Sequence, residues 1–269
     1  MSYVLQTEKD IPYRTVDGIV LRMDLFFAKS DTDTPRPCAL FFHGGGWREG
    51  CKEDVRFFPL ITDLLLESGF VVGSAEYRLV GKNGGGFPQS VEDAMEAIRF
   101  LDRQSAVRID PFRKAVFGIS AGAHLALTAV LTDDPQCFSP VKTVVDLCGP
   151  AYMGGQRKPF CEVVMPPATQ RFIRDFVGSG NPEDASPLCL CEHPPQRPSV
   201  LIVQGDSDEC VNPEISRMLY DRLMSNGFFA EYLEVENSNH TFHALPETFL
   251  YPDAGTLYRT IGRFIIDNT

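Results

Sequence analysis

Two kinds of hydrophobic pattern alternate along most of this chain. Residues 11–27 alternate apolar and polar positions around Asp17-Gly18, which is typical of a β-hairpin. Further along, continuous apolar runs predict buried strands, and apolar residues spaced three and four apart predict helices. The predicted strands are 38–42, 70–79, 114–120, 141–150, 199–203 and 229–237, and the predicted helices are 57–69, 90–104, 121–132, 214–227 and 255–267.

This order of elements predicts the fold class. Strands that alternate with helices of ten or more residues indicate an α/β protein, with a mainly parallel sheet covered by helices on both faces. Ser90, with Asp93 three residues later, predicts an N-cap close to a capping box for the helix 90–104. We expect a single domain over residues 1–269.

The segment 151–187 interrupts this rhythm. It is rich in glycine, proline and polar residues, and only 168–178 has a helical pattern. We expect it to form a small cap or rim, inserted between two strands over the end of the sheet where ligands bind.

Composition narrows the class of partner. The net charge of -11 argues against an electrostatic grip on nucleic acid or on an anionic membrane. The eight cysteines include no CxxC pair, and the closest two are Cys189 and Cys191, so zinc-site spacing is absent and we expect free, mostly buried thiols. No transmembrane or secretory segment is visible, and charges begin at Glu8, which predicts a cytoplasmic protein.

The stretch "AVFGISAGAHLAL" contains the first candidate for chemistry. Gly118, Ser120 and Gly122 match the pattern G-x-S-x-G, with an apolar strand before the serine and small residues and a helix after it. A nucleophile on such a sharp strand-to-helix turn needs glycine two positions away on either side, because larger side chains would collide with neighbouring elements. Ser120 is therefore a candidate nucleophile, and the alternative is a serine that caps a buried helix.

A second motif, "HGGGW", follows the strand 38–42. Consecutive glycines let backbone N–H groups face a developing oxyanion without hindrance from side chains. The amides of Gly45, Gly46 and Ala121 are the expected donors, and Trp47 is a candidate for substrate contact. The alternative is a flexible turn that contains three glycines.

An acid and a histidine are expected later in the chain. The loop after the strand 199–203 offers Asp206, Asp208 and Glu209, and the loop after 229–237 offers His240 and His243. Both loops lie at carboxyl ends of predicted parallel strands, where a doubly wound sheet gathers its site, and an imidazole there can be held by a carboxylate. His124 and His193 are expected to be structural.

Taken together, these stretches resemble a known family. "HGGGW", "EYRL", "FPQSVEDA", "GISAGAHLAL", "ASPL", "GDSDECV" and "NHTF" recur in this order in α/β-hydrolase carboxylesterases, in the group that includes acetyl esterases and bifunctional acetylxylan and feruloyl esterases. The resemblance runs from about Val20 to the end of the chain. It implies an α/β-hydrolase fold and a Ser-Asp-His triad of Ser120, Asp208 and His240, with His243 as the second choice of base.

The chain departs from the resembling family in two places. Gln204 stands where the family usually has histidine in "HGxxD", a position expected to matter little because it is not catalytic. "GKNGGGFP" replaces a shorter loop, and its glycines suggest a mobile rim.

The resemblance implies hydrolysis of short or compact acyl esters, such as acetyl or feruloyl esters of plant-derived carbohydrates, without metal or organic cofactor. The expected partner is a small-molecule or oligosaccharide ester. Three alternatives stay open. The first is an aryl formamidase, and the second is a non-catalytic binding protein with a hydrolase fold. The third is a serine exopeptidase of the prolyl oligopeptidase type, although this chain has no room for the accessory domain of those enzymes.

Overall fold

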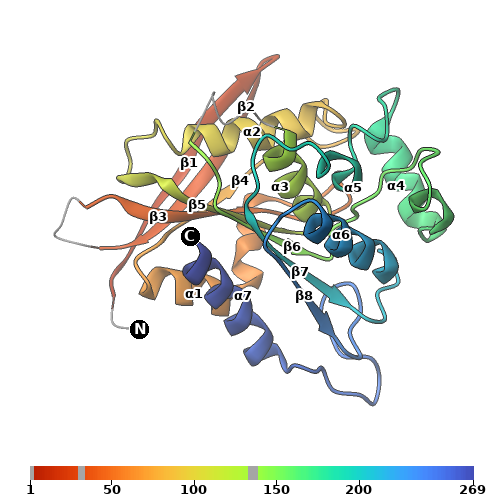
Figure 1. Ribbon diagram of the computed structural model, residues 1–269. Helices are drawn as coiled ribbons and strands as arrows, with labels where there is room; N and C mark the ends of the chain where they lie inside the picture. The colour runs from red at the N-terminus through yellow and green to blue at the C-terminus, as the bar shows by residue number, and fades with distance from the viewer. Residues whose placement is uncertain (1–2, 30–33, 133–138) are drawn as a thin grey trace.

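The computed structural model describes residues 3–29, 34–132 and 139–269, and its strands form one eight-stranded sheet (Figure 1). The strand order is β1-β2-β4-β3-β5-β6-β7-β8; β1 and β2 run antiparallel to their neighbours, and β4, β3 and β5 to β8 are parallel. The strands are β1 Leu5–Val16, β2 Ile19–Ala28, β3 Arg36–Phe42, β4 Val71–Ala75, β5 Ile109–Ile119, β6 Thr143–Leu147, β7 Ser199–Gly205 and β8 Ala230–Val235. The predicted α/β class and mainly parallel sheet are confirmed.

Helices cover both faces of this sheet. One face carries α1 (Pro59–Glu67) and α7 (Ala254–Asn268). The other carries α2 (Gln89–Phe100), α3 (Ala121–Thr132), α5 (Pro187–Leu190) and α6 (Pro213–Ser225). Two short 3-10 helices, η1 (Lys52–Phe57) and η2 (Phe160–Glu162), complete the set together with α4 (Pro167–Val177). No helix in these residues combines the length and hydrophobicity that a membrane crossing requires.

Strand β3 shows why the central strands are continuously apolar. Cys38, Leu40 and Phe42 pack into the core on the α2 and α3 side, while Ala39 and Phe41 pack into the core on the α1 and α7 side. Successive side chains of a strand point to opposite faces, so a strand buried on both faces must be apolar at every position.

The predicted hairpin is confirmed. Strands β1 and β2 pair antiparallel, with Val16 opposite Ile19. The turn residues Asp17 and Gly18 both have positive φ, at 48° and 78°, as a type I′ turn requires.

The predicted capping box at Ser90 and Asp93 is wrong. Helix α2 begins before Ser90, and its N-cap residue is Pro88. The Ser90 hydroxyl donates a 2.7 Å hydrogen bond to the backbone oxygen of Arg78, and the Asp93 carboxylate pairs with the guanidinium groups of Arg78 and Arg14. Asp93 is fully buried. An unpaired buried carboxylate costs more free energy than a helix N-terminus without a side-chain cap, so Asp93 pairs with the arginines.

The cysteine thiols test one prediction from the composition. The seven cysteines in the described residues are free, and three of them are buried: Cys38, Cys148 and Cys191. The expectation of mostly buried thiols therefore holds only in part.

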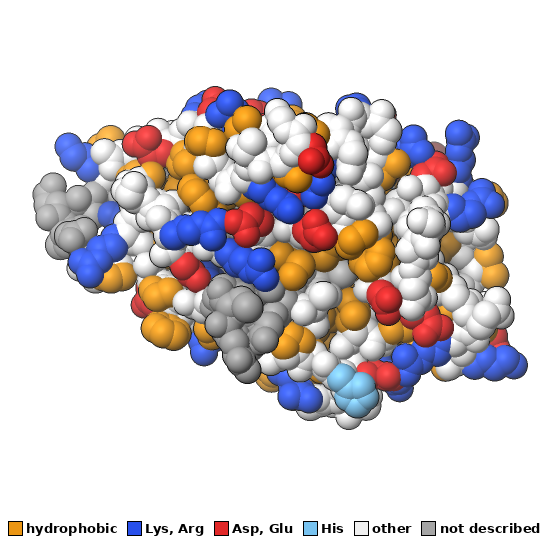
Figure 2. All heavy atoms as spheres, turned by 90° about the horizontal axis from the view of Figure 1, so that it is seen from above, with side chains coloured by type: hydrophobic (Ala, Val, Ile, Leu, Met, Phe, Trp, Pro, Cys, Tyr) orange, Lys and Arg blue, Asp and Glu red, His pale blue; other side chains and the backbone are white. Residues whose placement is uncertain are grey.

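Figure 2 shows one face on which basic and acidic side chains are interspersed. Ion pairs such as that of Arg103 with Glu96 also join basic and acidic side chains.

Candidate active site

Ser120 lies on the tight turn between β5 and α3. Its φ is +53°, in the left-handed region that a serine rarely adopts. The Ser120 N–H donates a 2.8 Å hydrogen bond to the backbone oxygen of Leu147, which holds the turn in place. A Cβ atom added to Gly122 would lie 2.1 Å from the backbone oxygen of Phe42, and one added to Gly118 would lie 2.5 Å from the backbone of Gly122. The backbone is therefore too crowded for side chains at both glycines.

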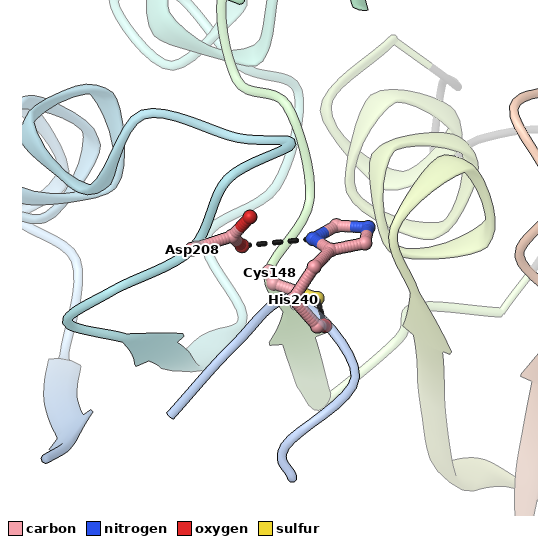
Figure 3. Close-up of side chains that lie close together, drawn as sticks. All are labelled: Cys148, Asp208 and His240. Atoms are coloured by element: carbon pink, nitrogen blue, oxygen red, sulfur yellow. Dashed lines mark hydrogen bonds and ion pairs between the residues drawn. The ribbon is translucent and has the colours of Figure 1, made fainter. Parts of the chain in front are cut away.

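Ser120, His240 and Asp208 form one chain of hydrogen bonds. His240 Nε2 lies 2.9 Å from Ser120 Oγ, and His240 Nδ1 lies 2.8 Å from Asp208 Oδ2. Figure 3 shows the carboxylate of Asp208 and the ring of His240 facing each other from two loops. An ionised carboxylate only accepts hydrogen bonds, so Nδ1 carries the proton and the Nε2 lone pair faces the Ser120 hydroxyl.

Asp208 is held rigidly beneath the histidine. Its side chain is 0% exposed, whereas that of His240 is 13% exposed. Asp208 Oδ1 accepts hydrogen bonds from the backbone N–H groups of Cys210 and Val211, at 2.7 and 2.8 Å. These bonds compensate the carboxylate for lost water and fix the plane of the carboxyl group.

Asp206 has a different part in the same loop. Its Oδ1 accepts a 3.1 Å hydrogen bond from the Ser238 N–H. Burial works to raise the pKa of Asp206, but hydrogen bonds from the backbone of Asn237 and Ser238 hold it below its ordinary value. Asp206 therefore ties the loop that carries His240 to the end of β7 and does not contact the imidazole.

The two aspartates should separate clearly by mutation. We expect Asp208→Asn to lower kcat for an ester about 10⁴-fold, because an amide at this place stabilises the wrong tautomer of His240. Asp206→Asn keeps the acceptor oxygen and should lower kcat less than about 10-fold. Steady-state hydrolysis of p-nitrophenyl acetate by both variants checks this, and greater sensitivity at Asp206 would show that the acid is misassigned.

His43 shapes the glycine loop. Its Nδ1 donates a 2.8 Å hydrogen bond to the backbone oxygen of Gly44, and its ring stacks on Tyr77 with 4.2 Å between centroids. The Tyr77 hydroxyl donates to the backbone oxygen of His43 at 2.8 Å. Burial lowers the pKa of His43, so the ring acts as a neutral strut inside the loop.

The three residues with predicted oxyanion donors line one pocket with Ser120. Within the described residues, the amides of Gly45, Gly46 and Ala121 donate no hydrogen bond to other protein groups, and all three residues line the pocket that contains Ser120. Gly45 has a φ of +105°, and a Cβ there would lie 2.4 Å from the backbone oxygen of Glu49. This position therefore requires glycine.

Trp47, the candidate for substrate contact, is among the residues that line the pocket, but little of its side chain is accessible. It is 1% exposed, and its ring stacks on Phe176 of α4 with 4.5 Å between centroids. Its Nε1 donates to His124 Nδ1 at 3.3 Å, and His124 Nε2 donates to the backbone oxygen of Ala185 at 2.8 Å. Burial lowers the pKa of His124 to about 4, so the ring is neutral. Trp47 and His124 thus join the glycine loop to α3 and to the segment 151–187.

A pocket of about 800 Å³ opens beside Ser120. Several of its walls come from elements far apart in the sequence, whose residues the sequence analysis did not single out: Ala168, Thr169 and Phe172 of α4, Phe57 and Phe58 around η1, and Tyr258 of α7. Arg48, next to Trp47, pairs with Asp175 of α4. The expected rim segment 151–187 therefore contributes α4 to the pocket wall.

The remaining histidines lie apart from the hydrogen-bond chain. His243 is exposed at the pocket rim, and its Nδ1 lies 2.9 Å from the Thr241 hydroxyl oxygen. His193 is exposed on the loop before β7. The structure thus brings His240, and not His243, to Ser120.

Within the described residues, Cys148, Asp208 and His240 form the one set of three side chains close enough to hold a metal ion, with potential ligand atoms within 4.8 Å. Cys148 Sγ donates to the backbone oxygen of His240 at 3.2 Å, and burial raises the pKa of this thiol well above its ordinary value. The thiol is thus held protonated, and Cys148 would have to lose this proton before it could bind a metal.

Asp146 is a buried carboxylate close to the turn that carries Ser120. It lies on β6 opposite Gly118 of β5, and its Oδ1 accepts a 2.7 Å hydrogen bond from the Gly149 N–H. Burial raises the pKa of Asp146 from 3.8 to about 7, although the Gly149 hydrogen bond works in the opposite direction.

The stability of the fold should therefore depend on the charge of Asp146. Its folded pKa lies above its unfolded value, so its favourable contribution is complete below about pH 4 and is lost as the pH rises through about 7. Relative to wild type, Asp146→Asn should gain about 2 to 4 kcal/mol in unfolding free energy between those limits. Urea unfolding across this range measures the difference, and a constant difference would contradict the prediction.

Comparison with known proteins gives a consistent result. The sequence matches the BD-FAE family model over residues 23–223. The non-reducing polyketide synthase atr1 of Stereocaulon alpinum is 31% identical over 156 residues, which are 55% of this chain and 6% of the synthase. Esterase LipC of Mycobacterium tuberculosis is 27% identical over 241 residues, which are 83% of this chain and 57% of LipC.

A solved structure extends the comparison to the fold. Esterase 2 of Thermogutta terrifontis, in a propionate-bound form, superimposes with a TM-score of 0.76 at 22% sequence identity. The match covers 97% of this chain and 94% of that one, so nearly the whole α/β-hydrolase fold is shared. The chain spans only 6% of the length of the polyketide synthase, so that protein's own activity is no guide to this chain.

Proposed function

Because this chain belongs to the BD-FAE family of α/β-hydrolase esterases, we propose that it hydrolyses carboxylic esters with Ser120, His240 and Asp208 as its catalytic triad. One observation carries the proposal. The hydrogen-bond chain from Asp208 through His240 to Ser120 ends in a pocket where three backbone amides have no hydrogen-bond partner among the described protein residues. A nucleophile, its base, an orienting acid and oxyanion donors are the groups that acyl transfer needs.

The acylation step follows from this geometry. His240 Nε2 takes the proton of Ser120 as Oγ attacks the carbonyl carbon of the ester. The amides of Gly45, Gly46 and Ala121 stabilise the negative charge that develops on the carbonyl oxygen. The protonated imidazole, stabilised by Asp208, then gives its proton to the leaving alcohol.

Deacylation reverses the roles. A water molecule gives its proton to His240 Nε2 and attacks the acyl carbon, and the same amides stabilise the second tetrahedral intermediate. Collapse of that intermediate releases the carboxylic acid and returns the proton to Ser120. Each group acts twice, and the protein needs no metal or organic cofactor for either step.

We propose short or compact acyl esters as substrates, including acetyl and feruloyl esters of plant-derived carbohydrates. The apolar walls at Phe58, Phe172 and Tyr258 suit a small apolar or aromatic acyl group, and the volume of about 800 Å³ accommodates more than an acetyl group. The propionate in the Thermogutta terrifontis esterase supports a compact acyl group.

A substrate panel tests this function. It compares p-nitrophenyl acetate, butyrate and octanoate with methyl ferulate, acetylated xylo-oligosaccharides and N-formylkynurenine. We expect the highest kcat/KM among the acetyl, butyrate and ferulate esters, and a lower value for the octanoate than for the acetate and the butyrate. Faster turnover of N-formylkynurenine than of every ester would instead establish an aryl formamidase, and no turnover would favour a binding protein.

A further inference from the structure

Gln204 is a buried polar side chain at the end of β7 that the mechanism above does not use. It is 0% exposed. Its Nε2 lies 2.8 Å from Asp208 Oδ2, the same oxygen that accepts the proton of His240 Nδ1. The sequence suggested that this position matters little, but the structure places it directly against the proposed triad acid.

The orientation of the Gln204 amide follows from its neighbours. Nε2 lies 2.8 Å from Asp208 Oδ2 and 3.2 Å from the backbone oxygen of Gly205. An ionised carboxylate and a backbone carbonyl only accept hydrogen bonds, so the NH₂ group must face both of them. The remaining Oε1 accepts a 2.8 Å hydrogen bond from the hydroxyl of Ser216 on α6.

The hydrogen-bond chain at the site is therefore longer than a triad. It runs from Ser216 through Gln204 to Asp208, and from there to His240 and Ser120. Asp208 Oδ1 is fixed by two backbone amides, whereas Oδ2 has Gln204 as its second donor besides the imidazole. Loss of the Gln204 donor would leave Oδ2 with the imidazole alone and a buried carboxylate incompletely satisfied.

We propose that Gln204 is a positioning residue, which holds Asp208 Oδ2 in line with His240 Nδ1 through its amide N–H. This inference rests on the proposed ester hydrolysis. Gln204 contacts neither the pocket nor the substrate, so it acts through Asp208 alone. Its loss should impair the proton transfers of His240 and leave substrate binding as it is.

The first test replaces the amide by an apolar chain of similar length. Gln204→Met should lower kcat for p-nitrophenyl acetate about 10- to 100-fold, the size expected for one lost hydrogen bond to a charged group, with KM within about twofold of wild type. Ser216→Ala removes only the group that steadies Oε1 and should lower kcat less than about fivefold.

Rescue and a matched control separate positioning from general stability. Gln204→His keeps an N–H donor and should restore kcat to within about fivefold of wild type. Gln196 offers the matched control, because its Nε2 donates to the backbone oxygen of Val130 and its Oε1 accepts from the Val141 N–H. Gln196→Met makes the same chemical change away from the pocket and should leave kcat unchanged. Equal kcat in wild type and Gln204→Met would overturn the proposal.

A nearly isosteric variant keeps the test decisive if Gln204→Met does not fold. In Gln204→Glu, a protonated carboxyl can still donate to Asp208, whereas an ionised one repels it. Among the described residues, the other titratable groups around Asp208 include His240, the thiols of Cys148 and Cys210, and Glu209, which accepts from the backbone N–H of His240. Asp146 also belongs to this set, because its charge acts on Cys148 together with that of Asp208.

All of these groups are shared with wild type, so the ratio of variant to wild-type kcat isolates the new carboxyl. Two adjacent carboxyls raise one another's proton affinity, so this ratio should fall as the pH rises from about 6 to 8. A constant ratio would contradict the inference. Failure of the proposed function has a different signature, because wild type itself would then turn over no ester.

Discussion

Ser120→Ala is expected to lower kcat for p-nitrophenyl acetate by about 10⁴- to 10⁶-fold. The variant has no nucleophile, so His240 can act only on water, and the remaining rate comes from the oxyanion amides and from binding. The fold should persist, because alanine and serine bear a similar cost at a φ of +53° and the Ser120 N–H bond to Leu147 uses the backbone alone.

A control guards this result against loss of folded protein. Ser225, at the end of α6, has a hydroxyl that donates to the backbone oxygen of Arg222 and lies outside the pocket lining. Ser225→Ala should keep wild-type kcat, and circular dichroism should give similar unfolding temperatures for both variants. Near-normal turnover by folded, pure Ser120→Ala would end the proposed mechanism.

His240→Ala should have an effect of the same size, a loss of about 10⁴- to 10⁶-fold in kcat. The imidazole of His240 links Asp208 to Ser120, with 2.8 Å from Nδ1 to Asp208 Oδ2 and 2.9 Å from Nε2 to Ser120 Oγ. Without it, no group can take the Ser120 proton or return it to the leaving alcohol. Single-turnover measurements with p-nitrophenyl acetate separate this chemical defect from a change in binding.

His243→Ala is the matched comparison on the same loop. His243 is exposed at the pocket rim and hydrogen-bonded to Thr241. The His243→Ala change should therefore alter kcat by less than about tenfold and mainly alter KM. Loss of activity in His243→Ala, with retention in His240→Ala, would show that the catalytic base is His243 and not His240.

The parts of the fold that the sequence predicted well are those with a local physical cause. The hairpin follows from Asp17-Gly18, and the central strands follow from runs that are apolar at every position. The elbow at Ser120 could be recognised because crowded backbone excludes side chains at Gly118 and Gly122, which leaves a glycine pattern in the sequence.

The sequence analysis missed side-chain contacts that leave no local pattern. The capping role expected for Asp93 is wrong, because two arginines on other elements pair with its carboxylate. The stacking of Trp47 on Phe176 and its contact with His124 could not be expected from the sequence. The same holds for the hydrogen bond between the Gln204 amide and Asp208 across a turn. Such partners emerge only when the chain is folded.

Covalent labelling of the nucleophile tests the central claim most directly. The protein is treated with a fluorophosphonate, which phosphonylates activated serines, and the adduct is located by peptide mass spectrometry. The account predicts one adduct, on Ser120, that forms in wild type and is lost in Ser120→Ala and strongly slowed in His240→Ala. Absence of any adduct in folded wild-type protein, or an adduct on another residue, would contradict it.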